Sequence, residues 1–125
     1  MGDAKKILVV DDNPTIMRLL ERRLSGEGYE VCTACNGRQG LDLATREMPD
    51  LIVSDVDMPL MDGKEMAARL KTSVRTNRIP VIFLTALVKS FQSGQTSGEY
   101  LYLSKSCKPT ELLSAIRDRL YLDSQ

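Results

Sequence analysis

The sequence predicts an α/β domain in which helices cover both faces of a parallel sheet. Short, wholly apolar runs recur at residues 7–10, 51–53 and 81–84, and such runs are typical of strands buried on both faces. Segments with apolar residues at helical spacing separate the runs. A polar residue follows each run directly, as expected where parallel strands deliver side chains to one edge of a sheet. Alternation of strands and helices favours the parallel arrangement.

The first strand and helix have clear boundaries in the sequence. Residues 7–10 predict the strand. Asn13 and Pro14 mark the start of the helix, because Asn caps free N–H groups and Pro fits the first helical position. Gly26 or Gly28 ends the helix. Its apolar face consists of Ile16, Met17, Leu19, Leu20 and Leu24.

The next two units follow the same pattern. Residues 29–34 alternate weakly and predict the second strand, and Asn36 with Gly37 predicts a turn. The short helix that follows ends before Pro49, and residues 51–53 predict the third strand. Apolar residues mark the helices after these two strands, namely Leu41, Leu43 and Ala44 in one and Met66, Ala67 and Leu70 in the other.

The C-terminal part contains two further strands and one segment of ambiguous pattern. Residues 81–84 and 100–103 predict the strands. The segment from Val88 to Gly98 is poor in apolar residues and contains two glycines, so we expect a short helix or an irregular loop with fast amide exchange. Pro109 begins the last helix, whose apolar face consists of Leu112, Leu113, Ile116 and Leu120.

Five successive strand–helix units, without an internal repeat or linker, define the expected topology. They fit a flavodoxin-like, doubly wound five-stranded parallel sheet with strand order 2-1-3-4-5 and right-handed crossovers. The ligand site of such a sheet lies outside the carboxyl ends of the strands, where the order reverses between strands 1 and 3. We expect one domain over residues 1–125, with the core of the fold within residues 5–122.

Charge and hydropathy argue against two classes of partner. The chain has 17 Lys and Arg residues and 17 Asp and Glu residues. This balance argues against direct nucleic-acid binding, which needs excess cations to displace counterions, and against a polybasic membrane anchor. The longest wholly apolar runs are four residues, so the sequence predicts no membrane insertion.

Histidine and cysteine content limits the chemistry. The sequence has no histidine, which excludes Ser-His-Asp and Cys-His catalysis and a His-ligated zinc site within the chain. Three cysteines are an odd number, and no signal-peptide pattern precedes Lys5, so we expect reduced thiols and a cytoplasmic location. Cys32 and Cys35 have C-x-x-C spacing. However, Cys32 falls within a predicted strand and not at the helix N-terminus where a redox pair normally lies.

Polar residues at the ends of the predicted strands form the candidate site. Asp11 and Asp12 follow the first strand, Asp55 the third and Thr85 the fourth. Lys105 follows the fifth strand. Three neighbouring carboxylates repel one another, and a hard divalent cation such as Mg²⁺ relieves that repulsion. A hydroxyl and an ammonium group beside them can hold a phosphoryl group, so the combination indicates a site although each residue alone is ordinary in a loop.

Four motifs along the chain share their spacing with one family. They are Val-Val-Asp11-Asp12-Asn, Asp55-Val-Asp57-Met58-Pro59 with Asp62-Gly63, Leu84-Thr85-Ala86, and Tyr102-Leu103-Ser104-Lys105. In these motifs the chain resembles the receiver domain of two-component response regulators, in its single-domain, chemotaxis-regulator-like form. The Asp-x-x-Met-Pro element together with the upstream acid pair is highly specific, and the resemblance extends from about Lys5 to Leu122.

The resemblance implies a site for phosphoryl transfer. Asp55 would accept the group from a histidine kinase or phosphotransfer protein, which supplies the histidine that this chain lacks. Asp11, Asp12 and Asp55 would form the Mg²⁺ pocket. Asp12 would be a direct ligand, and the backbone carbonyl of Asp57 would complete the set. Lys105 would pair with the phosphoryl group, and the chain would be a signalling phospho-acceptor that catalyses only its own phosphorylation and dephosphorylation.

The resemblance also implies a route for signalling. Thr85 would be the switch hydroxyl and Tyr102 the switch aromatic residue. Phosphorylation would draw Thr85 inward and let Tyr102 turn in. The fourth helix, fifth strand and fifth helix of the family would form the output surface, which acts on an unknown output protein. The sequence leaves open whether the chain also forms a homodimer.

Two features depart from the family pattern. The family has Lys-Pro with a cis bond where this chain has Lys105 and Ser106, and a cis bond to a non-proline residue costs about 3–4 kcal/mol, so we expect a trans bond. A Lys-Pro pair does occur at Lys108 and Pro109. Lys105 has the family spacing from Tyr102, so we assign the role to Lys105. The region of the fourth helix is also shorter than usual and rich in Gln, Ser and Gly, which predicts an unusual output surface.

Three alternative functions are weighed against this interpretation. Ser106 and the weak fourth helix favour a phosphorylation-independent, receiver-like protein-binding module. A haloacid-dehalogenase-type phosphatase also has Asp-x-Asp after a strand, as at Asp55 and Asp57, but Thr or Val where this chain has Pro59. A flavodoxin shares the fold, but its phosphate loop of Ser and Thr residues after the first strand is absent from this sequence.

Overall fold

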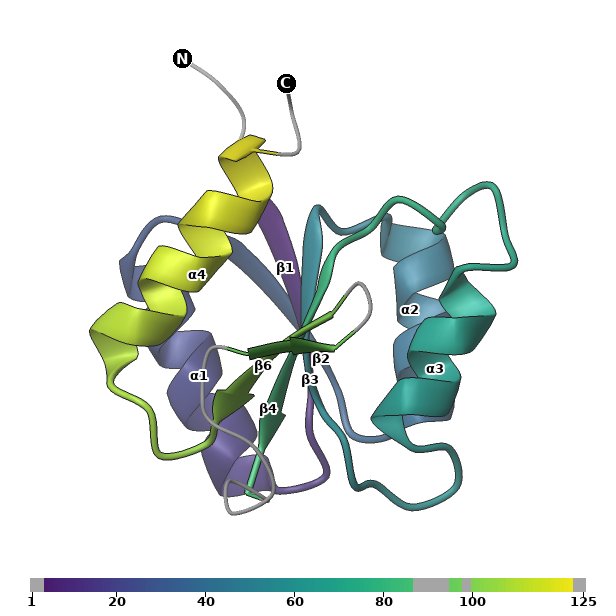
Figure 1. Cartoon of the computed structure of the whole chain (residues 1–125), viewed down its shortest axis with the longest axis horizontal. Helices are drawn as coiled ribbons and strands as arrows, with labels where there is room; N and C mark the ends of the chain where they lie inside the picture. The colour runs from purple at the N-terminus through teal and green to yellow at the C-terminus, as the bar shows by residue number, and fades with distance from the viewer. Residues whose placement is uncertain (1–3, 87–94, 98–99, 123–125) are drawn as a thin grey trace.

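The structure, a computed structural model, describes residues 4–86, 95–97 and 100–122 as three layers (Figure 1). One face of the central sheet carries α1 (Pro14–Gly26) and α4 (Pro109–Leu122), and the other carries α2 (Gly37–Glu47) and α3 (Gly63–Leu70). The strands are β1 (Lys6–Val10), β2 (Glu30–Ala34), β3 (Leu51–Asp55), β4 (Val81–Thr85), β5 (Gln95–Ser97) and β6 (Tyr100–Ser104). This arrangement confirms the predicted α/β class.

The strand order confirms the doubly wound sheet. Within the described residues the order is β2-β1-β3-β4-β6-β5, and every pair except β5 with β6 is parallel. Since β6 is the predicted fifth strand, the parallel part has the expected order 2-1-3-4-5. The reversal lies between β1 and β3, so the carboxyl ends of β1, β3, β4 and β6 meet at the edge where the site is expected.

One predicted segment is partly wrong. We expected a short helix or an irregular loop between Val88 and Gly98, but Gln95–Ser97 forms β5, in which Gln95 lies opposite Tyr102 of β6. A helix needs an apolar face to bury, and these three polar residues offer none. Pairing with a sheet edge satisfies backbone N–H and C=O groups whatever the side chains are. The other residues of that segment, 88–94 and 98, lie outside the described part of the chain.

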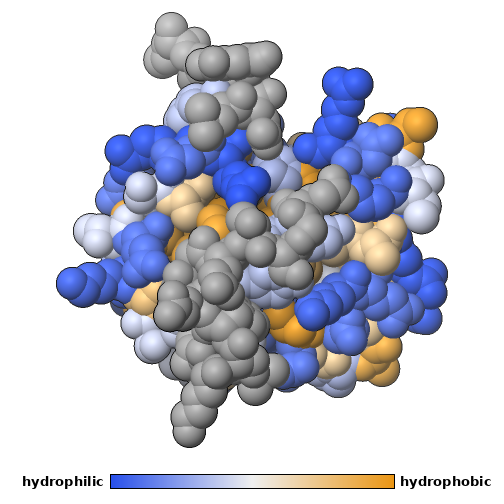
Figure 2. All heavy atoms as spheres, in the orientation of Figure 1, coloured by the Kyte–Doolittle hydropathy of each residue, from blue (hydrophilic) through white to orange (hydrophobic). Residues whose placement is uncertain are grey.

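Two apolar layers, one on each side of the sheet, form the core. Ile7 and Val9 face α1 and α4, whereas Leu8 and Val10 face α2 and α3, and all four side chains are buried. Central strands are therefore covered on both faces, which explains why their sequences are wholly apolar. Figure 2 shows mostly hydrophilic residues on the face in view. Among the described residues, no helix has the length and apolar character needed to span a membrane.

Helices α1 and α2 begin within a few residues of the preceding strand, and α3 begins after the longer loop that follows β3. Asn13, Asn36 and Asp62 cap them, with side-chain oxygens that accept backbone N–H groups of the first turn. Such caps stabilise a helix by about 1 kcal/mol each and fix where the preceding loop ends. Helix α1 ends at Gly26, as predicted, and Gly28 then adopts a φ of 93° that favours glycine.

Candidate functional site

Three carboxylates and one ammonium group meet at the carboxyl edge of the sheet. Asp11 and Asp12 follow β1, and Asp55 ends β3. Each acid offers one carboxylate oxygen, and the three oxygens lie within 4.8 Å of one another. Lys105, which follows β6, places its Nζ 3.1 Å from Asp55 Oδ2 and 3.4 Å from Asp11 Oδ2. The topology thus brings together four side chains from three distant segments of the sequence, and we call this group the acidic cluster.

The three acids of the acidic cluster differ in their exposure to solvent. Asp11 and Asp55 are 2% and 6% exposed, whereas Asp12 is an exposed residue. Asp11 is fixed by its own loop, because its Oδ1 accepts the backbone N–H of Asn13 at 2.8 Å while its Oδ2 faces Lys105. Asp12 is therefore the member of the cluster that an ion in solution can reach.

Burial and neighbouring charges have opposing effects on the pKa values of Asp55 and Lys105. Burial raises the pKa of Asp55, the Lys105 ammonium acts in the opposite direction, and the Asp11 carboxylate adds to the rise. Burial alone lowers the pKa of Lys105, but its hydrogen bond to Asp55 and the charge of Asp11 outweigh this, so the pKa is raised. A simple ion pair lowers the pKa of its acid. One lysine therefore does not offset the burial of Asp55 and its repulsion by Asp11.

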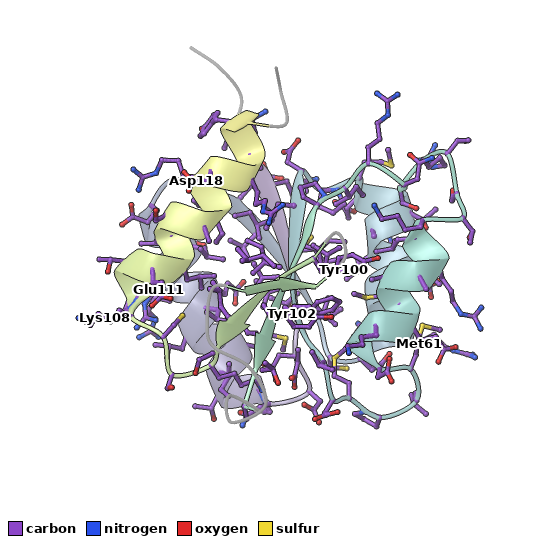
Figure 3. The ribbon with its side chains drawn as sticks, in the orientation of Figure 1. Met61, Tyr100, Tyr102, Lys108, Glu111 and Asp118 are labelled. Atoms are coloured by element: carbon purple, nitrogen blue, oxygen red, sulfur yellow. The ribbon has the colours of Figure 1, made fainter. Side chains whose placement is uncertain are left out.

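The structure separates the two lysines that the sequence offered. The Lys105–Ser106 bond is trans, as expected, since the described residues contain no cis peptide bond. The backbone N–H of Lys105 donates to the Thr85 carbonyl at 2.9 Å, which ties Lys105 to the end of β4. Lys108 is exposed at the start of α4 and lies at the outer side of the molecule in Figure 3. Lys105, and not Lys108, is the lysine of the acidic cluster.

Thr85 and Tyr102 lie on neighbouring strands beside the acidic cluster. Thr85 is buried at the end of β4, opposite Ser104 of β6. The ring of Tyr102, labelled in Figure 3, is also buried. It stacks on Phe83, with 5.2 Å between the ring centroids. Lys64 Nζ lies 5.6 Å from the centroid of the Tyr102 ring. Tyr102 is thus buried in this structure, and its movement on phosphorylation stays a prediction.

Two glycines let the loop after β3 approach the site closely. A Cβ at Gly63 would collide with the backbone carbonyl of Asp55. The N–H of Gly37 donates to the Met61 carbonyl at 3.1 Å, and a Cβ at Gly37 would collide with that same oxygen. Asp57, whose carbonyl is the expected fourth magnesium ligand, lies exposed in the loop between these contacts. Glycine at both positions is required for this close packing.

The same loop contains an exposed and strained leucine that the sequence analysis missed. Leu60 has a φ of 72° and is 83% exposed. The N–H of Met61 donates to the carbonyl of Pro59 at 2.8 Å, so the three residues form a γ-turn centred on Leu60. The left-handed region costs a non-glycine residue about 1–2 kcal/mol. No sequence pattern signals this turn, because a leucine seldom adopts a positive φ.

Two serines on either side of Lys105 were also missed as a pair. The oxygens of Ser104 and Ser106 lie 2.7 Å apart, and the N–H of Ser106 donates to Ser104 Oγ at 3.0 Å. In the sequence, Ser106 stands out only as a departure from Lys-Pro. The Ser-Lys-Ser pattern is the signal that could have revealed the pair, because serine hydroxyls often accept the backbone N–H two residues later.

The acidic cluster has a donor set that suits a hard divalent cation. Its acids offer three carboxylate oxygens close together, and Mg²⁺ prefers oxygen ligands and retains several waters. Three carboxylates face one ammonium group, so a dication would balance the remaining charge. One acid is exposed and two are buried, so an ion held by them would be reached from the side of Asp12.

Known sequences identify the family. The family model for the response regulator receiver domain matches residues 7–117. The probable transcriptional regulator ycf29 of Porphyra purpurea is 37% identical over 120 residues, which cover 94% of this chain and 57% of that protein. The response regulator PleD of Caulobacter vibrioides is 39% identical over 118 residues, which cover 90% of this chain and 25% of that protein. The chain thus spans about half the length of the first relative and a quarter of the second.

Solved structures agree with this match. The receiver domain of the sensor histidine kinase PA1611 from Pseudomonas aeruginosa, solved with a magnesium ion in its active-site cleft, has a TM-score of 0.82 at 28% identity, covering 94% of this chain and 98% of that one. The chemotaxis response regulator CheY4 of Vibrio cholerae has a TM-score of 0.81 at 33% identity, covering 94% and 99%. Strand order, motifs and both comparisons agree, and the chain belongs to the response regulator receiver domain family, whose members are signalling phospho-acceptors.

Proposed function

We propose that Asp55 accepts a phosphoryl group from the phosphohistidine of a histidine kinase or phosphotransfer protein. One observation carries the proposal. The carboxylate of Asp55 is buried at the carboxyl edge of the sheet, within 3.1 Å of a lysine ammonium group and beside two further acids. This arrangement provides a nucleophile and a cation for the transferred group at one point.

The transfer would break one bond and form one. A carboxylate oxygen of Asp55 attacks phosphorus, the P–N bond of the phosphohistidine breaks, and its electron pair returns to the imidazole nitrogen of the partner. The product is an acyl phosphate on Asp55. Lys105 Nζ, which already contacts both Asp55 and Asp11, would pair with the phosphoryl oxygens and stabilise their charge. Asp11 would keep Lys105 directed at the reacting group.

The proposal includes Mg²⁺ as the cofactor. Asp11, Asp12, Asp55 and the backbone carbonyl of Asp57 would hold it, with Asp12 as a direct ligand from the solvent side. When bound, the ion supplies positive charge that neutralises the phosphoryl oxygens. The support for this site is the close approach of three acidic oxygens and the raised pKa of Asp55, to which burial contributes most.

We further propose that the surface formed by β5, β6 and α4 transmits the signal to an output protein. Of the expected output surface, β6 and α4 are the fifth strand and the fifth helix, and most of the segment expected to form the fourth helix lies outside the described residues. Phosphorylation adds about 1.5 to 2 negative charges at Asp55, which would act on Thr85 and on the backbone of Lys105. Two observations support this. The backbone N–H of Lys105 donates a hydrogen bond to the Thr85 carbonyl at 2.9 Å, and β4 pairs with β6.

Three free cysteines fit the reducing cytoplasm that we propose as the location. Burial raises the pKa of Cys32 and Cys107, so both favour the unreactive thiol form. A thiol of this kind has no part in the proposed chemistry, which relies on carboxylates and one lysine.

Acetyl phosphate with Mg²⁺ tests the proposal without a partner protein. We expect intact mass spectrometry to show the gain of one phosphoryl group, and Asp55→Asn to lose it. Asp42→Asn, which changes an exposed acid of α2, is the matched control and should gain the group normally. If the folded, unaltered protein gains no phosphoryl group from acetyl phosphate or from phosphoramidate, the proposal is wrong, and a phosphorylation-independent binding module becomes the better interpretation.

A further inference from the structure

The turn after β6, which contains Lys105, is held by hydrogen bonds of its backbone and of two serine hydroxyls. The N–H of Cys107 donates to the Ser104 carbonyl at 3.0 Å, which closes a four-residue turn with Lys105 and Ser106 at its centre. Inside this turn, the N–H of Ser106 donates to Ser104 Oγ at 3.0 Å, and the two hydroxyl oxygens lie 2.7 Å apart. Ser104 is buried and Ser106 is exposed, so these bonds lie at the boundary between the core and the solvent.

A proline at position 106 could not form this turn. Proline has no N–H to donate to Ser104 Oγ, and in the second central position of a turn it is disfavoured with a trans bond. Serine with a trans bond supplies both the N–H and a hydroxyl. The hydrogen-bonded serine turn and a Lys-Pro turn are therefore two different ways to fix the residue that precedes position 106.

The backbone of Lys105 is restrained from both sides. Before the turn, its own N–H donates to the Thr85 carbonyl at 2.9 Å. After it, the N–H of Ser106 is held by Ser104 Oγ. Four methylene groups separate the Lys105 Cα from Nζ and give the side chain considerable freedom. A fixed starting point is what allows Nζ to rest between Asp55 and Asp11.

We propose that Ser104 and Ser106 are positioning residues that act through Lys105 and replace the Lys-Pro turn of the family. The proposal rests on the proposed function, because it gives the serines a role in phosphorylation of Asp55. Ser104 is the more important of the two, since its hydroxyl bonds to both the N–H and the hydroxyl of Ser106. The backbone N–H of Lys105 is bonded on one side and that of Ser106 on the other, so the serine turn would act on the reaction by fixing where the lysine side chain begins.

A double-mutant cycle tests whether Ser104 acts through Lys105. The rate of phosphorylation by acetyl phosphate is measured at saturating Mg²⁺ for the unaltered protein, Ser104→Ala, Lys105→Ala and the double variant. We expect Ser104→Ala to slow the reaction about fivefold, the equivalent of one hydrogen bond of roughly 1 kcal/mol. In the Lys105→Ala background the same change should have no further effect. A slowing of equal size in both backgrounds would show a general structural role and overturn the proposal.

Two further variants sharpen the result. Ser104→Thr keeps the hydroxyl on a residue that suits a strand end, and it should restore most of the rate. Ser114→Ala changes an exposed serine of α4 and should leave the rate unchanged, as the matched control. A Ser104→Thr variant as slow as Ser104→Ala, at unchanged stability, would contradict a role for the hydroxyl. A Ser104→Ala variant as fast as the unaltered protein would do the same.

A second measurement does not depend on phosphorylation. Acetic anhydride labels lysines, and peptide mass spectrometry compares Lys105 with the exposed Lys108 in the same sample. Lys105 between two carboxylates should label slowly, and Ser104→Ala should increase its labelling relative to Lys108 several-fold. Unchanged labelling would overturn the positioning role. If the unaltered protein is not phosphorylated, the proposed function fails, but this measurement still decides whether the serine turn fixes Lys105.

Discussion

Replacing Asp12 with alanine should change stability in opposite directions without and with magnesium. The acidic oxygens of the cluster lie within 4.8 Å of one another, and two like charges at that distance repel by about 1 kcal/mol at the dielectric constant of water. Asp12 is exposed, so the value for water applies. Without metal, Asp12→Ala should therefore raise the free energy of unfolding by about 1 kcal/mol and the melting temperature by roughly 4 °C.

Magnesium should reverse this order. An ion that binds only the folded protein stabilises it by about 1.4 kcal/mol at ten times its dissociation constant. The unaltered protein should gain this stability, whereas the variant, which lacks a ligand, should gain little. Thermal melts followed by circular dichroism over a Mg²⁺ series at constant ionic strength measure both effects. We expect the melting temperatures of the two proteins to cross as Mg²⁺ increases.

Two results would refute the reasoning about Asp12. A full response of Asp12→Ala to Mg²⁺ would show that the ion binds elsewhere or without this carboxylate. A variant that melts below the unaltered protein in the absence of metal would show that repulsion within the acidic cluster is not the dominant effect. Asp42→Ala, an exposed acid of α2, is the control and should keep the full response to Mg²⁺.

Three further predictions concern the lysine, the loop and pH. Lys105→Ala should slow phosphorylation by acetyl phosphate but retain the Mg²⁺-dependent rise in melting temperature. Lys108→Ala should change neither quantity, and the reverse pattern would assign the role to Lys108. Leu60→Gly should raise the free energy of unfolding, measured in urea, by about 0.5–1 kcal/mol. The positive φ costs leucine about 1–2 kcal/mol, which exceeds the entropic cost of ordering a glycine on folding. A destabilised variant would contradict the strain at Leu60. Burial raises the pKa of Asp55 above its ordinary 3.8, so the folded state binds this proton more tightly than the unfolded state. The stability that Asp55 contributes is present below pH 3.8 and lost as pH rises through the raised pKa. Without metal, the stability advantage of Asp55→Asn should therefore grow across that window in urea titrations, and an advantage that shrinks would count against the assignment.

The sequence predicted most of the fold because the central strands are covered on both sides. Residues 7–10 alternate between the two apolar layers, so every position must be apolar, and the pattern is visible without a structure. Asn13 and Pro14 likewise mark the start of α1, because a helix start depends on local chemistry. In contrast, Gln95–Ser97 pairs with β6 through its backbone, and backbone pairing leaves no mark on side-chain composition.

The main residues of the candidate site were also predictable from the sequence, but the hydrogen bonds that hold them in place were not. Asp11, Asp55 and Lys105 come together because parallel strands end at one edge, which is a rule of topology. The turn that holds Lys105 depends on hydrogen bonds of Ser104, and the residue types alone do not specify these bonds. The γ-turn at Leu60 gives a leucine a positive φ, and local propensity argues against that conformation.

The most direct test of the account is to locate the phosphoryl group on the chain. The protein is treated with acetyl phosphate and Mg²⁺, and borohydride then reduces the acyl phosphate to an alcohol, which marks the modified aspartate as homoserine in peptide mass spectrometry. The account predicts homoserine at position 55 and its absence when Mg²⁺ is withheld. Homoserine at position 11 or 12, or none in a protein that remains folded, would contradict the assignment of Asp55 as the phospho-acceptor.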